Sequence, residues 1–262
     1  MAVYRKRNDR PNRKKKTDEL DEVQEELLHQ ESTTAKVFDS LDEGTTKTEA
    51  WVQKHQKTIL GVLICAAVIG LGYLAYQQFV LAPKEKEGAN ELYFAQDFFQ
   101  QALDASDDKV KDSLLNVALK GGNGKYGLLE IIDNYSGTKA ANLANYSAGM
   151  VYMNQGNYNK AIEHLKKFKS PDEILGTLAL GNIGDAYSQQ KNNAEALNYY
   201  KKAFEHSKNE FTAPMYLKKA GIIAMLQNDN KEANKYFERI KEEYPNSEEA
   251  RTIDILIGKI SN

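Results

Sequence analysis

The chain has 262 residues, of which 41% are apolar and 27% are charged, values that are ordinary for a globular protein. Its 35 basic and 37 acidic side chains leave a net charge of -2, which excludes the strongly basic composition of a general nucleic-acid binder. A single cysteine excludes a disulfide framework and a cysteine-based zinc site, and the scarcity of proline, with 5 in all, favours helices.

The first 46 residues form a polar segment whose charge changes sign along its length. Residues 1–16 carry a net charge of +7, whereas residues 18–31 carry seven acidic side chains and a short apolar stripe. This composition is typical of chains without a packed core, so we expect 1–46 to be a largely disordered cytoplasmic tail. The basic part, 1–16, suits contact with anionic lipid or with ribosomal RNA, and the sequence does not separate these two partners.

Residues 47–83 contain an apolar run that predicts one transmembrane helix over about 59–81. No charged residue lies between Thr58 and Pro83, and twelve of the 23 residues from 59 to 81 are Ile, Leu, Val or Phe. Twenty-three helical residues measure about 34 Å, enough to cross a hydrocarbon layer of about 30 Å in membrane lipid. A cleaved signal peptide is disfavoured because 57 residues precede the run, and a lipoprotein signal because Cys65 lies in its middle.

Charge around the run predicts its orientation. Three lysines precede it closely and two follow it, and the basic tail adds further positive charge to the N-terminal side. Positive charge favours the cytoplasmic side, so we expect the N-terminus inside and the C-terminal part outside. Within the run, Ala66 and Gly70 have the spacing of a small-residue pair for helix packing, with lipid contact as the alternative.

The remaining residues, 84–262, show helical periodicity throughout and predict a helical repeat domain. Apolar residues at helical spacing predict three helices between about 85 and 135, which we interpret as degenerate helical pairs. The glycine-rich segment 121–124 is expected to end the second helix. The apolar positions are Leu92, Ala95, Phe99 and Ala102, then Leu114, Leu115, Ala118 and Leu119, then Leu128, Leu129, Ile131 and Ile132.

From about residue 141 a pattern of small and large residues recurs three times. Gly149-x2-Tyr152-x8-Ala161-x3-Leu165 returns from Gly184 and again from Gly221, at intervals of 35 and 37 residues. The pattern resembles the tetratricopeptide repeat, a pair of helices in which small residues occupy the crossing. We therefore expect an all-α fold, with an α-solenoid of clear repeats over about 141–245 and a capping helix over about 247–259.

Two further details fit this register. Turns between paired helices are expected at Gly156-Asn157 and at Asn192-Asn193. The segments Tyr135–Ala141 and Tyr244–Ala250 resemble each other, and each is expected to end one unit and start the next helix.

The first helices of the repeats would line the inner face of the solenoid. The four methionines that follow the initiator all lie on these helices, and methionine adapts to varied apolar partners. A groove for unfolded or diverse peptides is one interpretation, and packing between helices is the alternative. The predicted groove residues are Tyr146, Met150, Met153, Leu178, Asp185, Gln189, Met215, Lys218, Ile222 and Met225.

Residues arranged for catalysis or metal binding are not found. The four histidines are widely separated, and no metalloprotease, P-loop, nucleophile-elbow or dinucleotide-binding motif occurs. We therefore expect no catalytic residue, no metal and no cofactor.

One membrane helix followed by such repeats resembles the YfgM-like family, ancillary subunits of the bacterial Sec translocon. The resemblance implies a periplasmic repeat domain at the inner membrane, association with SecYEG, partnership with a PpiD-like membrane-anchored chaperone, and action on unfolded exported proteins. A membrane-anchored adaptor for envelope assembly or cell division is the alternative. The resemblance covers about 50–262 and lies in Trp51, Lys57, Gly61, Gly70, Gly72, Tyr73, Tyr76 and Tyr135–Ala141.

Overall fold

The computed structural model describes residues 51–122 and 124–260, so the predicted tail lies outside the described residues. Helices account for nearly all of the described secondary structure. These residues contain no β-strand, and their one isolated bridge joins Gly122 to Lys125. The prediction of an all-α fold is confirmed.

The apolar run is helical, as predicted. Residues 51–76 are α-helical, a π-helical turn η1 (Gln77–Leu81) follows, and α2 (Ala82–Asp104) continues from it. Among the described residues, Trp51–Asp104 is the one helical stretch long and apolar enough to cross a membrane. None of the side chains from residue 59 to 81 is buried in the described part of the chain, and Ile69 remains 73% exposed. In a membrane, lipid would cover these apolar side chains and keep them out of water.

The chain divides into two compact units at Tyr73–Leu74. The second unit holds the repeats. After α2 its helices are α3 (Asp108–Lys120), α4 (Leu128–Asn134), α5 (Lys139–Asn154), α6 (Tyr158–Lys167), α7 (Glu173–Gln189), α8 (Asn193–His206), α9 (Thr212–Leu226), α10 (Asn230–Glu243) and α11 (Ile253–Ile260).

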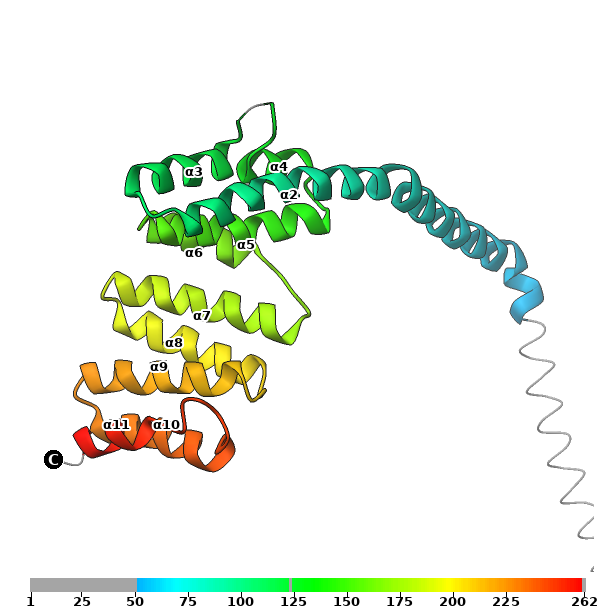
Figure 1. Ribbon diagram of the computed structural model, residues 1–262. Helices are drawn as coiled ribbons and strands as arrows, with labels where there is room; N and C mark the ends of the chain where they lie inside the picture. Colours follow the sequence, from blue (N-terminus) through cyan, green and yellow to red (C-terminus); the bar gives the residue numbers. More distant parts are fainter. Residues whose placement is uncertain (1–50, 123, 261–262) are drawn as a thin grey trace, which may run out of the picture. The chain divides into compact units, whose positions relative to one another are not determined.

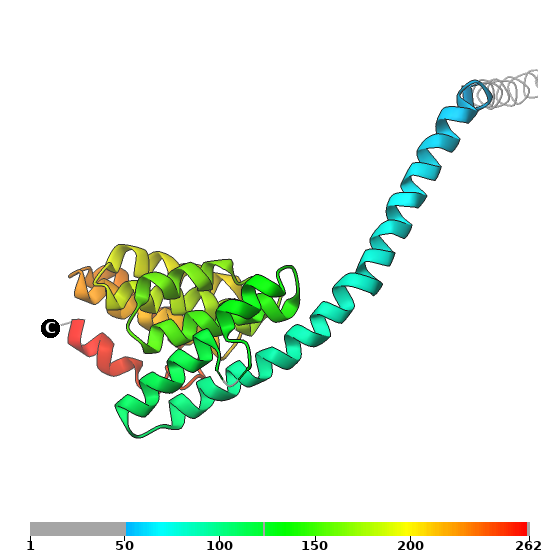
Figure 2. The same cartoon turned by 90° about the horizontal axis from the view of Figure 1, so that it is seen from above.

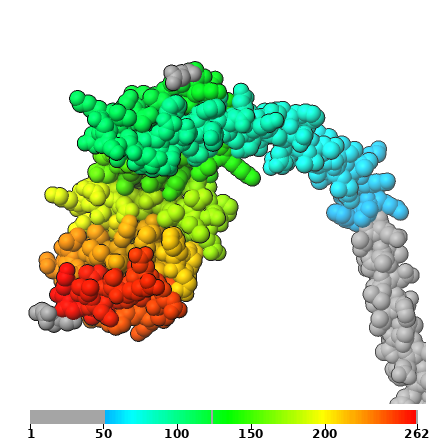
Figure 3. Space-filling model, in the orientation of Figure 1, coloured from blue at the N-terminus to red at the C-terminus, as the bar shows by residue number. Residues whose placement is uncertain are grey.

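Within this unit the helices form a stack of antiparallel pairs. α5 packs on α6, α7 on α8 and α9 on α10, and each pair contacts the next in chain order (Figure 1). Viewed from above, successive pairs overlap along the stack (Figure 2). The space-filling view shows the layers in contact from α2 to α11 (Figure 3). This is the arrangement of an α-solenoid, in which each repeat buries the apolar face of its neighbour.

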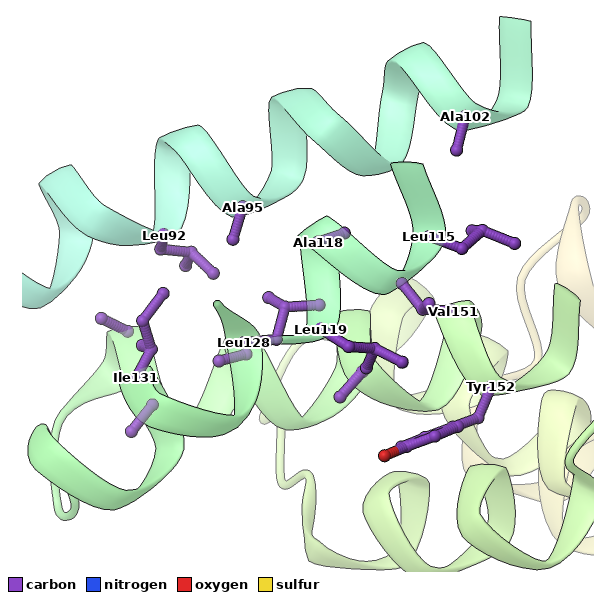
Figure 4. Close-up of a cluster of buried hydrophobic side chains, with 14 of the residues drawn as sticks. Leu92, Ala95, Ala102, Leu115, Ala118, Leu119, Leu128, Ile131, Val151 and Tyr152 are labelled. Atoms are coloured by element: carbon purple, nitrogen blue, oxygen red, sulfur yellow. The ribbon is translucent and has the colours of Figure 1, made fainter. Parts of the chain in front are cut away.

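The helices before the repeats share one apolar core with the first repeat. Figure 4 shows Leu92, Ala95 and Ala102 on one face of α2, directed toward α3 and α4. Leu115 of α3 and Ile131 of α4 are fully buried in the same cluster. The periodicity predicted the three helices, and Gly121, with φ of 82°, ends α3 where the glycine-rich segment was expected to.

The helices of each repeat cross at a glycine that faces a large side chain of the second helix. A Cβ atom at Gly149 or at Gly184 would lie 2.6 Å from that facing side chain, closer than real contacts allow. The crossing alanines, 12 residues after each glycine, are fully buried. The glycines therefore set the distance between the paired helices, as predicted. The facing pairs are Gly149 with Leu165, Gly184 with Tyr200, and Gly221 with Phe237.

The turns between paired helices also share one construction. A residue with positive φ is followed by an Asn or Asp side chain that accepts a hydrogen bond from the third backbone N–H of the next helix. The second turn lies at Lys191-Asn192, one residue before the predicted Asn192-Asn193, because Asn192 caps α8. The other turns are Gly156-Asn157 and Asn228-Asp229.

The two similar segments at residues 135 and 244 have matching hydrogen bonds. Thr138 and Ser247 each donate to the carbonyl three residues before, at 2.7 and 2.8 Å, and accept from the N–H three residues after. After Thr138 an α-helix follows at once, whereas α11 begins at Ile253 and not at the predicted 247. Residues 248–252 instead form turns in which N–H groups bond to carbonyls three residues back.

A substitution of Gly221 by alanine tests the helix crossing. Its added Cβ would collide with Phe237, which is fully buried and has no room to move. We expect Gly221→Ala to lower the free energy of unfolding by about 1–3 kcal/mol. Thermal unfolding of the full chain in detergent, followed by circular dichroism, measures this loss.

The matched control is Gly258→Ala in α11, where an added Cβ meets nothing within 4 Å. Because alanine favours helix over glycine, this variant should be unchanged or more stable by up to about 1 kcal/mol. Equal melting temperatures for the two variants would contradict the proposed role of the repeat glycine.

His164 makes the stability of the first repeat depend on pH. Its Nδ1 lies 3.1 Å from Asn145 Oδ1, and its ring stacks on Tyr152 with centroids 5.4 Å apart. Burial lowers the pKa of His164 below its ordinary value. The unfolded chain thus takes up a proton at a higher pH than the folded chain, so stability is full above about pH 6.5 and falls as pH decreases.

Thermal unfolding of the wild type and of His164→Gln between pH 7.5 and 5 measures this linkage. The melting temperature of the wild type should fall more steeply over this range than that of the variant. Parallel curves would show that His164 is not responsible.

Candidate protein-interaction surface

The first helices of the three repeats present partly exposed stripes at helical spacing. On α7 the stripe runs through Leu175, Leu178, Asn182 and Asp185, and each of these side chains is half-buried. The corresponding residues of α5 are Leu143, Tyr146 and Met150, and those of α9 are Met215, Lys218, Ile222 and Met225. A continuous partly exposed face of this kind is the surface that solenoids use for partners.

Hydrogen bonds join the stripes of α5 and α7. The Asn182 side-chain amide lies 3.4 Å from the Tyr146 hydroxyl and 3.1 Å from the Met150 sulfur. The structure thus brings two of the predicted groove residues together, with Asn182 as a link that the sequence analysis did not identify. Burial raises the pKa of Tyr146, so its hydroxyl stays neutral and able to donate.

At its start, the face is hollowed between α2, α5 and α7. A cavity of about 460 Å³ is lined by aromatic and aliphatic side chains, two glutamine amides, the Ser147 hydroxyl and the Asp97 carboxylate. The Gln96 amide donates a hydrogen bond of 3.1 Å to the Ser147 hydroxyl, which joins α2 to α5. The Tyr93 side chain is 67% exposed. The lining residues are Tyr93, Gln96, Asp97, Phe99, Gln100, Leu143, Tyr146, Ser147 and Leu175.

The contribution of α2 to this hollow was missed by sequence reasoning. α2 precedes the recognisable repeats, so transfer of the repeat register assigns it no inner face. The spacing of Tyr93, Gln96 and Gln100 places them on one side of a helix, which was the available signal. Only the packing of α2 against α5 shows that this side borders the inner face.

Between α7 and α9 the face is held by a charged and aromatic cluster. Asp185 lies 2.7 Å from the Lys219 ammonium and accepts a hydrogen bond of 2.8 Å from the Tyr200 hydroxyl. Tyr216 stacks on Tyr200 with centroids 6.1 Å apart, and its ring occupies the space that a side chain at Gly181 would need. Asp185 is therefore engaged within the fold.

Burial, reinforced by the negative charge of Asp185, raises the pKa of both Tyr200 and Tyr216. Both hydroxyl groups thus stay neutral. The predicted groove residue Lys218 lies apart from this cluster and contacts the Thr252 hydroxyl at 3.4 Å.

The predicted methionines lie partly in the apolar core. Met153 packs against the apolar clusters that contain Val151 and Leu165, whereas Met215 and Met225, together with Leu178, pack against the cluster that contains Phe237. Ile222 is 37% exposed and Gln189 is exposed. Their contact with a partner stays a prediction.

In the apolar helix, Ala66 and Gly70 are exposed, and a Cβ at Gly70 would meet nothing within 4 Å. No other helix of the described chain packs on them. Their packing against another membrane protein likewise stays a prediction.

Across residues 51–122 and 124–260 no group of three or more His, Cys, Asp or Glu side chains is arranged to hold a metal ion. The histidines in this part of the chain are separate. His164 contacts Asn145, His206 contacts the Thr177 hydroxyl at 3.3 Å, and His55 contacts the Trp51 carbonyl at 2.9 Å.

Comparison with known protein families shows which residues match tetratricopeptide repeats. Residues 144–170 and 178–209 match one model of the tetratricopeptide repeat, and residues 217–247 match a second. These segments are tetratricopeptide repeats. They coincide with the pairs α5–α6, α7–α8 and α9–α10, so the predicted register is confirmed.

Among solved structures, a similar chain is MamA 41-end from Desulfovibrio magneticus RS-1. It is 14% identical, with a TM-score of 0.42, over 59% of this chain and 77% of that chain. No curated protein matches the chain. Tetratricopeptide domains generally act as scaffolds for protein–protein interaction and lack catalytic activity, and this chain carries such a domain.

Proposed function

We propose that this protein is a non-enzymatic accessory subunit of the bacterial inner membrane that associates with the SecYEG translocon. In this proposal it acts with a PpiD-like periplasmic chaperone on unfolded exported proteins. The tetratricopeptide repeats support an interaction role, and the apolar helix supports attachment to a membrane. The narrower assignment to the translocon comes from the resemblance of residues 50–262 to the YfgM-like family.

The observation that carries the proposal is the hollow between α2, α5 and α7. Its aromatic and aliphatic walls can hold apolar side chains, and its glutamine amides can bond to the backbone of an extended chain. Such a surface suits unfolded segments of varied sequence, because backbone contacts do not depend on side-chain identity. Asp185 is already paired with Lys219, so its carboxylate is not free to pair with a partner.

The proposed topology puts this surface outside the cytoplasm. Residues 1–46 would form the cytoplasmic tail, 47–83 the juxtamembrane segment and membrane helix, and 84–262 the periplasmic repeat domain. The excess of lysine and arginine before the apolar run supports this orientation. An exported chain would then meet the repeat domain as it leaves the translocon.

Purification of the full chain from its host in mild detergent tests the association. We expect SecY to copurify, together with a membrane-anchored chaperone.

Tyr93→Ala removes the most exposed aromatic side chain of the hollow. It should weaken binding of an unfolded exported protein to the purified chain by about tenfold, because aromatic side chains that become buried in an interface contribute most to its affinity.

The matched control is Ile255→Ala, because Ile255 is 65% exposed and lies on α11, away from the hollow. It should bind as the wild type does. Copurification of division or outer-membrane assembly proteins without SecY would contradict the proposal in favour of an envelope adaptor. Equal losses in Tyr93→Ala and Ile255→Ala would show that the hollow is not the binding site.

A further inference from the structure

A cleft between α6, α7 and α8 carries positive charge that no acidic side chain neutralises. It has a volume of about 410 Å³ and lies on the second helices of the repeats, α6 and α8, together with part of α7. Lys166, Lys169 and Lys202 line it, and the lining contains no Asp or Glu. It is thus a different surface from the hollow of α2, α5 and α7, and it goes beyond the function proposed above.

The lysines of this cleft are held against tyrosines. The Lys166 ammonium donates to the Tyr187 hydroxyl at 3.1 Å and lies 5.6 Å from the ring centroid of Tyr199. The Lys202 ammonium lies 4.6 Å from the same Tyr199 centroid. The hydrogen bond that Lys166 donates to the Tyr187 hydroxyl raises the pKa of Lys166. Lys166 therefore stays charged, and the tyrosines position both ammonium groups without neutralising them.

The cleft lysines differ from a neighbouring lysine that is neutralised by an ion pair. Lys167 lies next in sequence to Lys166 and pairs with Glu163 at 2.8 Å, outside the cleft. None of the three cleft lysines makes an ion pair within the described part of the chain. The chain as a whole has a net charge of -2, so the positive charge of these three lysines is local to the cleft. It complements a negatively charged partner.

The floor of the cleft is apolar. Leu165 and Ile183 are buried and belong to a small cluster that joins the two larger apolar clusters of the stack. Phe168 and Leu180 complete the apolar part of the lining. The cleft thus has an apolar floor and ammonium groups at its edge. Together they fit a ligand that carries an apolar group and negative charge.

We propose that this cleft binds an acidic peptide segment of a partner protein, in which Asp or Glu residues flank a large apolar side chain. The apolar side chain would enter the floor near Leu165 and Ile183, and the carboxylates would meet Lys166 and Lys202 beside Tyr199. An anionic membrane presents headgroups on a surface with its acyl chains withdrawn, so it would leave the floor empty. A peptide presents both groups together.

Fluorescence anisotropy with the full chain in zwitterionic nanodiscs tests this proposal. The probe is a labelled peptide of sequence EDLFEDLFEDLF. We expect saturable binding that weakens with salt, and loss of binding when serine replaces each Leu and Phe of the peptide. In the chain, Lys166→Gln with Lys202→Gln should weaken binding by about tenfold or more, because two charge-assisted contacts are removed.

The matched control is Lys231→Gln with Lys259→Gln, which removes the same charge from exposed positions on α10 and α11. Circular dichroism of both variants confirms that they fold. No binding to the wild type, or equal affinity for the two variants, would overturn the proposal. Flotation of the nanodisc-held chain with phosphatidylglycerol vesicles, without peptide binding, would overturn it in favour of a lipid surface.

Discussion

The close approach of paired helices at three glycines is the constraint on which the rest of the repeat domain depends. Each glycine gives its space to a large side chain of the facing helix, and the buried alanine beside it completes the crossing. Because the pairs are this tight, the partly exposed sides of the first helices align into stripes along the stack. The faces that a partner could meet are thus set by residues that no partner touches.

The two surfaces described above differ in chemistry. The inner face is aromatic and amide-rich at its hollow, and Asp185 and Lys219 form an ion pair between α7 and α9. The cleft between α6, α7 and α8 has ammonium groups without ion-pair partners in the described residues, over an apolar floor. A scaffold with two such unlike surfaces can hold two partners of different chemistry at once, which is the role of an adaptor and requires no reaction on the protein itself.

Much of this fold could be predicted from sequence because its determinants are local. The spacing of Gly184, Ala196 and Tyr200 predicts a helical pair whatever lies around it, and the run 59–81 predicts a helix long and apolar enough to cross a membrane. The hollow was not predictable, since α2 lies outside the repeat pattern and reaches the inner face only by packing. The start of α11 was predicted too early because tight turns after Ser247 use bonds that sequence periodicity does not reveal.

Thiol labelling in intact cells stripped of their outer membrane tests the central claim, a repeat domain tethered outside the cytoplasm by one lipid-spanning helix. Cys65 is the single cysteine and lies within the apolar helix. We predict that an impermeant maleimide reaches Cys65 only after detergent denaturation, and that it labels Ser136→Cys, in a Cys65→Ser chain, from outside. Labelling of Cys65 in intact membranes, or protection of position 136 until the cells are opened, would contradict the account.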